Sequence, residues 1–277
     1  FGGDNTSSIS LNGIDDYINI PTSVSLDNIS TTLTVSAWIN PSNLSNGEHP
    51  RIVDRSEGPG GVTNRWFLTW SPTGTVDFGI GSGANGCLGN SAIPINSWTH
   101  VAATFDNGQI YIYINGILDA SANSSINSLS DIQNCAIKIG SAPESSFFPG
   151  KIDNVYIWDI ALSEEEILNS MNCLPTGSES GLISYWNFEF GEIVTDLTSN
   201  SNNGVIYGGT WTSDVPNQIC ESSCLLADSV YVNIAEPIVV DLVTNNPTCY
   251  GYDDGNATVS IINGENPENY IINWFDN

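Results

Sequence analysis

The sequence has 277 residues, enough for one large β domain and a smaller unit. It carries 31 Asp and Glu against five Lys and Arg, a formal net charge of −26, and this charge argues against nucleic acid or anionic lipid as a partner. No run of 18 apolar residues is present, so no membrane span is predicted, and two histidines, His49 and His100, leave little scope for histidine catalysis or zinc binding.

Residues 7–160 are a series of short runs in which apolar and polar residues alternate, separated by turn-forming residues. In QIYIYING (109–116), the isoleucines fall on one face and the tyrosines on the other, which is the period of a β-strand. Many such runs, with almost no helical periodicity, predict an all-β fold built as an antiparallel sandwich.

One short helix is expected in SEEEILNSM (163–171). Ser163 is a suitable N-cap, and Glu166 three residues later completes a capping box. The three glutamates of this turn could be catalytic carboxylates, but a solvated first turn that complements the helix N-terminus is the favoured interpretation.

Two connections divide the rest of the chain. NCLPTGSESG (172–181) has the Pro, Gly and Ser of a linker, two strand-like runs follow it, and DVPNQICESSC is a second hinge. From about Leu225 the runs SVYVNI, IVVDLV and NATVSII predict a separate small β unit. We expect domains over residues 1–222 and 225–277. Because no signal peptide opens the sequence and it stops within a strand-like run, we interpret it as an excerpt from a longer exported protein.

Six cysteines in a chain without a close CxxC pair favour disulfides over metal thiolates. The pairing that joins neighbouring segments is Cys87–Cys135, Cys173–Cys220 and Cys224–Cys249. Disulfides of this kind predict an extracellular location at the cell surface.

The segments LNGIDDYINIP, SWTHVAATFDNGQIYIYINGIL and GKIDNVYIWDIALSEEEIL resemble the laminin-G-like, concanavalin-like jelly-roll family, and together they cover residues 7–170. They are similar to its opening strand pair, its central hairpin, and its closing strand with a short helix. The resemblance implies a jelly-roll sandwich. At the hairpin, Asn115-Gly116 supplies the positive φ of a tight turn.

GLISYWNFEFGEIVTDLTSNSNNGVIYGGTWTSDVP resembles what is often the first portion of such a domain, yet here it follows the closing strand. It is either a circular permutation that completes the sandwich or the stub of a second module. Its length is too short for an independent core, so completion of the sandwich by residues 172–222 is favoured.

Cys249, Gly251, Asp254-Gly255, Tyr270 and Trp274 lie in a segment that resembles the SprB-type repeat of large gliding-motility surface adhesins. The family's paired glycines near 263–265 are replaced here by Asn-Gly-Glu. The resemblance implies a secreted cell-surface filament protein with a small, truncated immunoglobulin-like unit over 225–277. Neighbouring repeats of the same chain and the secretion machinery are then expected partners.

DLTSNSNNG (196–204) carries an unusual number of oxygen-bearing side chains, and calcium takes six to eight oxygen ligands. The jelly-roll resemblance implies a structural calcium ion in a loop of this kind. The expected ligands are Asp15, Asp153, Asp196, Asn200, Asn202 and Asn203. The alternative is an Asx-rich turn that satisfies its own backbone.

A ligand site is expected in DRSEGPGGVTNRWFLTW, because sugar sites combine aromatic rings with polar side chains. The candidates are Asp54, Arg55, Glu57, Asn64, Arg65 and Trp66. Three of the five basic residues, Arg51, Arg55 and Arg65, fall in this neighbourhood. The alternative is that the arginines pair with local carboxylates and the tryptophans fill the core.

No catalytic motif is present, and isolated His100 lies on an apolar-alternating strand, so no enzyme activity is expected. These observations predict a non-catalytic, calcium-stabilised module of an exported bacterial adhesin that binds a polysaccharide or surface glycoconjugate. The alternatives are a structural spacer of a surface filament and a carbohydrate-binding module attached to a secreted hydrolase.

Overall fold

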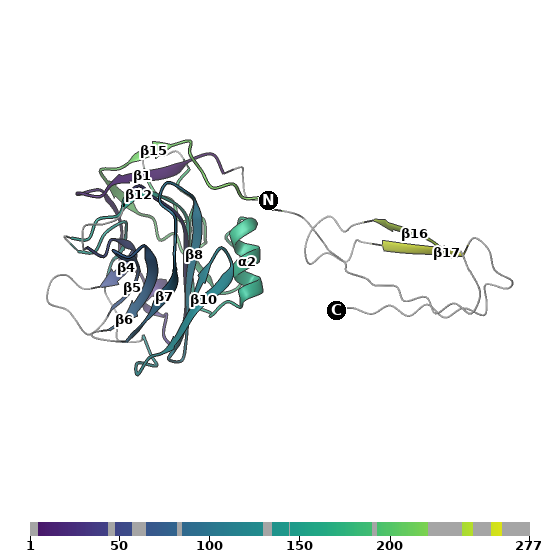
Figure 1. Cartoon of the computed structure of the whole chain (residues 1–277), viewed down its shortest axis with the longest axis horizontal. Helices are drawn as coiled ribbons and strands as arrows, with labels where there is room; N and C mark the ends of the chain where they lie inside the picture. The colour runs from purple at the N-terminus through teal and green to yellow at the C-terminus, as the bar shows by residue number, and fades with distance from the viewer. Residues whose placement is uncertain are drawn as a thin grey trace. The chain divides into compact units, whose positions relative to one another are not determined.

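The chain divides into two compact units, Phe1–Ile219 and Cys220–Asn277. The larger unit is an all-β antiparallel sandwich of two sheets (Figure 1), as the alternating sequence pattern predicts. The computed structural model describes residues 5–43, 48–56, 65–81, 85–129, 135–143, 145–189, 193–220, 240–245 and 256–261.

Over the described residues, the first sheet has eight strands in the order β10-β9-β8-β3-β12-β1-β15, with β13 also paired to β12. One edge of β12 pairs with β3, while the other pairs first with β1 and then with β13. A bulge at Asp153–Tyr156 lies where the partner changes. The strands are β1 Ser8–Asn12, β3 Thr32–Pro41, β8 Thr99–Asp106, β9 Gln109–Ile114, β10 Ile117–Asn123, β12 Pro149–Trp158, β13 Leu182–Trp186 and β15 Thr210–Thr212.

The second sheet, in the same described segments, has seven strands in the order β14-β2-β11-β4-β5-β6-β7. Every pair is antiparallel. The strands are β2 Tyr17–Ile20, β4 Arg51–Ser56, β5 Arg65–Trp70, β6 Thr75–Ile80, β7 Gly86–Ala92, β11 Ile137–Ile139 and β14 Val205–Tyr207.

Apolar side chains form a main core cluster and a second, smaller one. Ile110 and Ile112 of β9 belong to the main cluster. Tyr113 of the same strand belongs to the second cluster, together with Tyr156 and Ile167. The alternation predicted for QIYIYING is therefore confirmed, and both faces of this part of the first sheet are covered.

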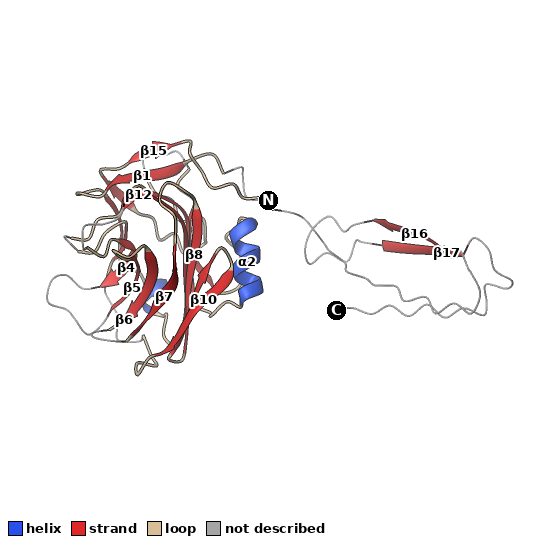
Figure 2. Ribbon diagram, viewed as in Figure 1, coloured by secondary structure: helices blue, strands red, loops and turns tan. Residues whose placement is uncertain are grey.

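Two short helices accompany the sheets within the described residues, where the sequence pattern predicted one. Helix α2, Glu164–Asn172, lies beside β8 and β10 (Figure 2) and has the predicted capping box of Ser163 and Glu166. Helix α1, Val24–Asp27, is a single turn capped by Ser23. Four residues are too few to show a helical period, which explains why the sequence pattern missed α1.

Residues 182–212 add strands to both sheets: β13 pairs with β12, β15 with β1, and β14 with β2. This segment therefore completes the sandwich. Cys173 and Cys220 form the predicted disulfide bond. The predicted Cys87–Cys135 bond is wrong, because both cysteines are buried and neither is part of a disulfide, and burial raises the pKa of Cys87 to about 11. Cys224 and Cys249 lie outside the described residues.

In the smaller unit the structure describes one antiparallel hairpin, β16 Val240–Asn245 with β17 Asn256–Ile261. The immunoglobulin-like and SprB-type features predicted for 225–277 fall largely outside the described residues. No helix in the described segments is long and apolar enough to cross a membrane.

Candidate functional site

The outer face of the second sheet, turned away from the core, carries a hollow of about 540 Å³ over β4–β7. Strand alternation determines its lining. Trp66, Leu68 and Trp70 of β5 are buried in the core, so Phe67 and Thr69 between them face outward. The side chains that matter most to the chemistry of the hollow come from four strands and one loop: Arg51, Phe67, Asp77, Leu88 and Ser146.

The Phe67 ring lies between the backbone of Gly79 and the guanidinium group of Arg51. Phe67 lies opposite Gly79 in the β5–β6 ladder, and a Cβ on Gly79 would come within 2.2 Å of Phe67 Cζ. The ring thus occupies the space that a side chain at position 79 would need. The Arg51 guanidinium carbon is 3.9 Å from the ring centroid, a cation–π contact. The sheet therefore presents a fixed aromatic ring.

Carboxylates flank this ring. Arg51 Nε donates to Asp54 Oδ2 at 3.0 Å, which fixes the guanidinium over Phe67. Asp77 accepts hydrogen bonds from Thr75 Oγ1 at 3.0 Å and from the Gly89 N–H at 3.2 Å, both at Oδ1. Oδ2 of Asp77 keeps acceptor capacity for a ligand hydroxyl.

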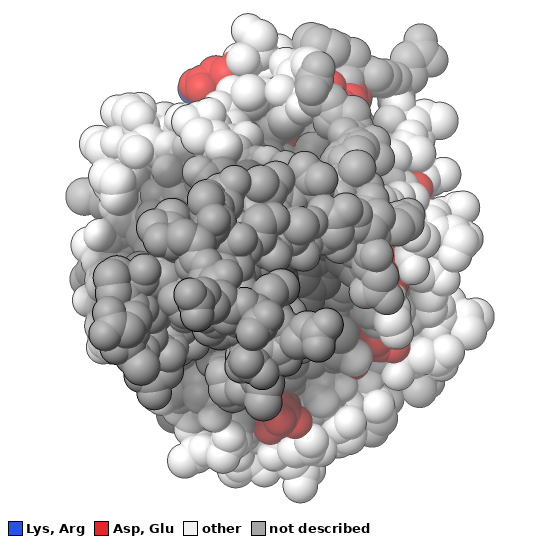
Figure 3. Space-filling model, turned by 90° about the vertical axis from the view of Figure 1, so that its right-hand side faces the viewer, with Lys and Arg blue, Asp and Glu red and all other residues white. Residues whose placement is uncertain are grey.

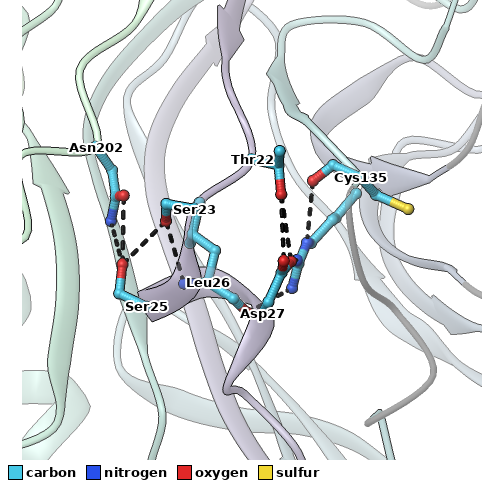
Figure 4. Close-up of polar contacts among 8 residues, drawn as sticks. Thr22, Ser23, Ser25, Leu26, Asp27, Cys135 and Asn202 are labelled. Atoms are coloured by element: carbon cyan, nitrogen blue, oxygen red, sulfur yellow. Dashed lines mark hydrogen bonds and ion pairs between the residues drawn. The ribbon is translucent and has the colours of Figure 1, made fainter.

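Arg55, predicted as a ligand residue, is 1% exposed and acts in the interior. Its Nη2 pairs with Asp27 Oδ1 at 2.5 Å, and its Nη1 donates to the Leu26 carbonyl at 2.6 Å. Arg55 Nε also donates to the Cys135 carbonyl at 3.4 Å. Two of its partners, Asp27 and Cys135, are labelled in Figure 4. Burial lowers the pKa of Arg55, an effect that Asp27 opposes. Arg55 therefore links α1 to the second sheet.

Trp66, the aromatic residue of the predicted site, is fully buried in the core. The structure thus corrects the prediction at Arg55 and Trp66, since neither side chain reaches the surface. Asp54 is 2% exposed and contributes by holding Arg51. Glu57 and Asn64 lie outside the described residues, as does the side chain of Arg65.

The sequence contained a signal for the ring that faces outward. In RWFLTW (65–70), Trp66, Leu68 and Trp70 form the more apolar phase of the alternation. Phe67 is consequently the aromatic residue of the opposite phase, the phase that faces solvent when one side of a sheet is buried. Applying the strand period to this run would have selected Phe67 instead of Trp66.

The loop 196–203 uses its oxygens internally. Asp196 accepts four hydrogen bonds, from the N–H groups of Tyr185, Thr198 and Asn202 and from the Thr198 hydroxyl. Asn203 Oδ1 accepts the Asp196 N–H, and the Asn202 side chain bonds Ser25 (Figure 4), while Asn200 donates to the Ile183 carbonyl. These are the bonds expected of a self-satisfying Asx-rich turn, and they occupy the acceptor sites of the Asp196 carboxylate.

Asp15 and Asp153 are the other predicted calcium ligands, and neither is hydrogen-bonded to the 196–203 loop. Exposed Asp15 accepts a bond from Asn12 Nδ2 at 2.8 Å. Asp153 is fully buried and accepts Asn5 Nδ2 at 2.9 Å and the Asn154 N–H at 2.8 Å. The buried Oδ1 of Asn5 has no hydrogen-bond partner. An unpaired amide oxygen beside a buried carboxylate is chemistry that suits a hard cation.

In the part of the chain that the structure describes, the acidic residues are not gathered in one place. Figure 3 shows carboxylates at separate places on the described part of one face. Across the described segments, no three His, Cys, Asp or Glu side chains are grouped so as to hold a metal ion. A calcium site in this part of the chain would therefore depend on amide and backbone oxygens as well as on a carboxylate.

A comparison with protein-family models decides the family. The model described as "Concanavalin A-like lectin/glucanases superfamily" matches residues 12–168, more than half of the chain. The chain belongs to this superfamily. The superfamily includes both lectins and glucanases, so membership is compatible with sugar binding and with sugar cleavage. No curated protein matches the chain significantly.

Among solved structures, a proposed carbohydrate binding protein from Bacteroides ovatus matches with a TM-score of 0.58 and 23% identity, over 75% of this chain. This chain spans 60% of that protein's length. A heptameric pentraxin from Limulus polyphemus matches with a TM-score of 0.54 and 15% identity, over 79% of this chain and 100% of its own. Because both identities are below 25%, these two matches show the fold of this chain and nothing about its ligand. Domain 4 of an extracellular arabinanase from Geobacillus stearothermophilus, in complex with arabinotriose, matches with a TM-score of 0.47 and 25% identity, over 58% of this chain and 74% of that domain.

Proposed function

We propose that the sandwich domain binds a carbohydrate in the hollow on the outer face of the second sheet. The observation that carries the proposal is the fixed Phe67 ring between Gly79 and the Arg51 guanidinium. Carbohydrates present apolar C–H groups that pack against aromatic side chains, and hydroxyls that pair with carboxylates and guanidinium groups. The hollow supplies both kinds of contact on a rigid sheet, with no conformational change required.

Each residue has a distinct part in this proposal. Phe67, whose ring face is covered by the Arg51 guanidinium, supplies an apolar ring edge, and Arg51 supplies N–H donors for ligand hydroxyls from a position set by Asp54. Asp77 accepts a hydroxyl through Oδ2. The exposed side chain of Leu88, 74% accessible, adds an apolar contact at the rim. The proposed function is binding without cleavage.

Calcium has a structural role in this proposal. The Asp153 carboxylate and the unpaired Asn5 Oδ1 would hold the ion, at the point where β12 changes partners. Glu189 lies close enough to raise the pKa of Asp153 further, although burial is the main cause of the shift. A bound cation would neutralise this buried negative charge. The 196–203 loop is the weaker candidate, because the acceptor sites of its Asp196 carboxylate are already used.

The domain is proposed to act outside the cell, as part of an exported bacterial surface adhesin. The Cys173–Cys220 disulfide supports an oxidising compartment. The SprB-type resemblance of residues 249–274, with its link to gliding-motility adhesins, is the basis for the adhesin role. The rival functions are a spacer within a surface filament and a carbohydrate-binding module attached to a secreted hydrolase.

Affinity electrophoresis against soluble arabinan, xylan, mannan and mixed-linkage glucan, with calcium present, tests the proposal. We expect at least one polysaccharide to retard the native chain, and Phe67→Ala to weaken that interaction by roughly tenfold, about 1.4 kcal/mol. Ile117→Ala is the matched control, because Ile117 is 67% exposed on β10 of the other sheet. Retardation by none of the polysaccharides would favour the spacer function, and an unchanged affinity of Phe67→Ala would move the site elsewhere.

A further inference from the structure

The outer face of the second sheet continues well beyond the hollow. Phe67 pairs with Asp54 of β4, Asp54 with Lys138 of β11, Lys138 with Asn19 of β2, and Asn19 with Val205 of β14. Side chains directly opposite one another in a ladder project from the same face. These residues therefore form one row that crosses five strands.

At the far end of this row lies an aromatic patch, which consists of Tyr17, Phe147 and Tyr207. Tyr17 and Tyr207 are direct partners in the β2–β14 ladder, and their rings stack at 4.8 Å with an interplanar angle of 8°. The Phe147 ring centroid is 6.4 Å from that of Tyr17, and Lys138 Nζ lies 4.1 Å from the Tyr17 ring centroid. Tyr207 is 48% exposed, so the patch offers an aromatic surface to solvent.

Consecutive residues join the patch to the hollow. Ser146 lines the hollow, and its carbonyl accepts the Arg51 N–H at 2.9 Å. The next residue, Phe147, belongs to the aromatic patch. Both places also have the same composition, an aromatic ring with a cation over its face: Arg51 over Phe67, and Lys138 over Tyr17.

The separation of these two places defines the size of a ligand that touches both. Tyr17 on β2 and Phe67 on β5 are three strand spacings apart, about 14 Å at the usual 4.8 Å per strand. This distance is longer than a monosaccharide. A terminal sugar could occupy only one of the two places, whereas a chain of several sugars laid across the strands would reach both.

We propose that the hollow and the aromatic patch are the two ends of one extended site, which binds an internal stretch of a polysaccharide chain. The inference rests on the proposed carbohydrate-binding function and specifies its ligand as a chain of several sugar units. Phe67 holds one end of the bound stretch, Tyr207 holds the other, and Lys138 in the row between them contacts the hydroxyls.

Calorimetry with a disaccharide-to-hexasaccharide series tests the extended site, using oligosaccharides of whichever of arabinan, xylan, mannan or glucan retards the native chain. We expect affinity to rise with chain length until both ends are occupied. Tyr207→Ala should weaken hexasaccharide binding by about three- to tenfold, the range of a lost aromatic contact, while it leaves the disaccharide unaffected. Phe67→Ala should weaken binding of both.

Thermal melting of Tyr207→Ala, at an exposed position, checks that the variant is folded, and Ile117→Ala again serves as the control. A hexasaccharide that binds no better than the disaccharide, with Tyr207→Ala equal to the native chain, would overturn the extended site and leave sugar binding in the hollow intact. If none of the polysaccharides binds, the extended site and the proposed function both fail.

Discussion

Adjacent residues on one strand differ completely in what they can contact. Trp66 is fully buried, while Phe67 next to it lines the hollow. On β4, Arg55 is enclosed by α1, whereas Arg51 stacks on Phe67. At the level of the single residue, the phase of the strand alternation decides whether an aromatic or a cationic side chain stabilises the fold or faces a ligand.

His100 is a second residue whose burial decides its role: imidazole is a common catalytic base, but this one lies in the interior. It lies on β8 with its ring 5.5 Å from Trp38, fully buried, and neither ring nitrogen has a hydrogen-bond partner. Its isolation on an apolar-alternating run favours a structural histidine over a base, and its burial agrees with this, although its ring nitrogens are not satisfied. Burial lowers the pKa of His100 from 6.5 to about 3.

This lowered pKa predicts acid sensitivity. Between pH 6.5 and about 3, the unfolded chain binds a proton at His100 that the folded chain does not. The stabilisation is thus fully present above pH 6.5 and is lost as the pH falls through this window. We expect His100 to account for a loss of about 2 kcal/mol in the free energy of unfolding between pH 7 and pH 5.

Urea denaturation of the native chain and of His100→Leu at pH 7, 6 and 5 measures this contribution. The variant should lack this part of the pH dependence over this range, because leucine does not titrate. An identical pH dependence in the two proteins would show that other groups cause the acid sensitivity.

At the scale of elements, β12 organises one end of the sandwich. At its bulge, Asn154 has a φ of 46° and is fully buried, with its side chain bonded to Gln218 and Tyr185. Gln218 also accepts a bond from Asn5 and donates to the Met171 carbonyl. The change of partner from β1 to β13 thus coincides with a buried polar network that includes residues from both ends of the larger unit.

The calcium prediction concerns Asp153, which is bonded to Asn5 of this network. Burial raises the pKa of Asp153 well above its ordinary value, so without a cation its ionised form destabilises the fold as the pH rises above that value. A bound calcium ion would reverse the effect. We expect EDTA to lower the melting temperature of the native chain, by an amount equivalent to about 3 kcal/mol when calcium is at about a hundred times its Kd.

Differential scanning calorimetry with calcium and with EDTA measures the shift. Asp153→Asn should abolish the calcium response, while Asp15→Asn, at an exposed predicted ligand bonded to Asn12, should retain it. If the native melting temperature is the same in calcium and EDTA, the chain has no structural calcium site.

Local elements could be predicted from the sequence because they depend on neighbouring residues. The alternation around Ile110 and the capping box of Ser163 and Glu166 both appear in the structure as expected. Pairings between distant segments carry no local signal. The partner change of β12 could not be derived from spacing, and neither could the absence of a disulfide between Cys87 and Cys135. The candidate site depends on such pairings, since it joins Phe67 to Arg51 and Gly79 across three strands.

At the scale of the whole molecule, charge restricts the class of ligand. The chain has a formal net charge of −26, and the described cations on the outer face of the second sheet are few: Arg51 is paired with Asp54, and Lys138 lies over Tyr17. At physiological salt the field of the other carboxylates is screened beyond about 8 Å, but it still acts on an approaching polyanion. A neutral polysaccharide experiences no such repulsion.

We therefore expect the chain to prefer neutral polysaccharides such as arabinan or mannan over acidic ones such as alginate or polygalacturonate. Affinity for a neutral chain should change little between low and high NaCl. Any affinity for an acidic chain should be weaker at low NaCl and should increase as salt screens the repulsion. Affinity electrophoresis at two salt concentrations measures both trends, with dextran as an uncharged control for gel effects. Tighter binding of the acidic chain at low salt would mean that Arg51 and Lys138 act as local anion sites and outweigh the net charge of the molecule.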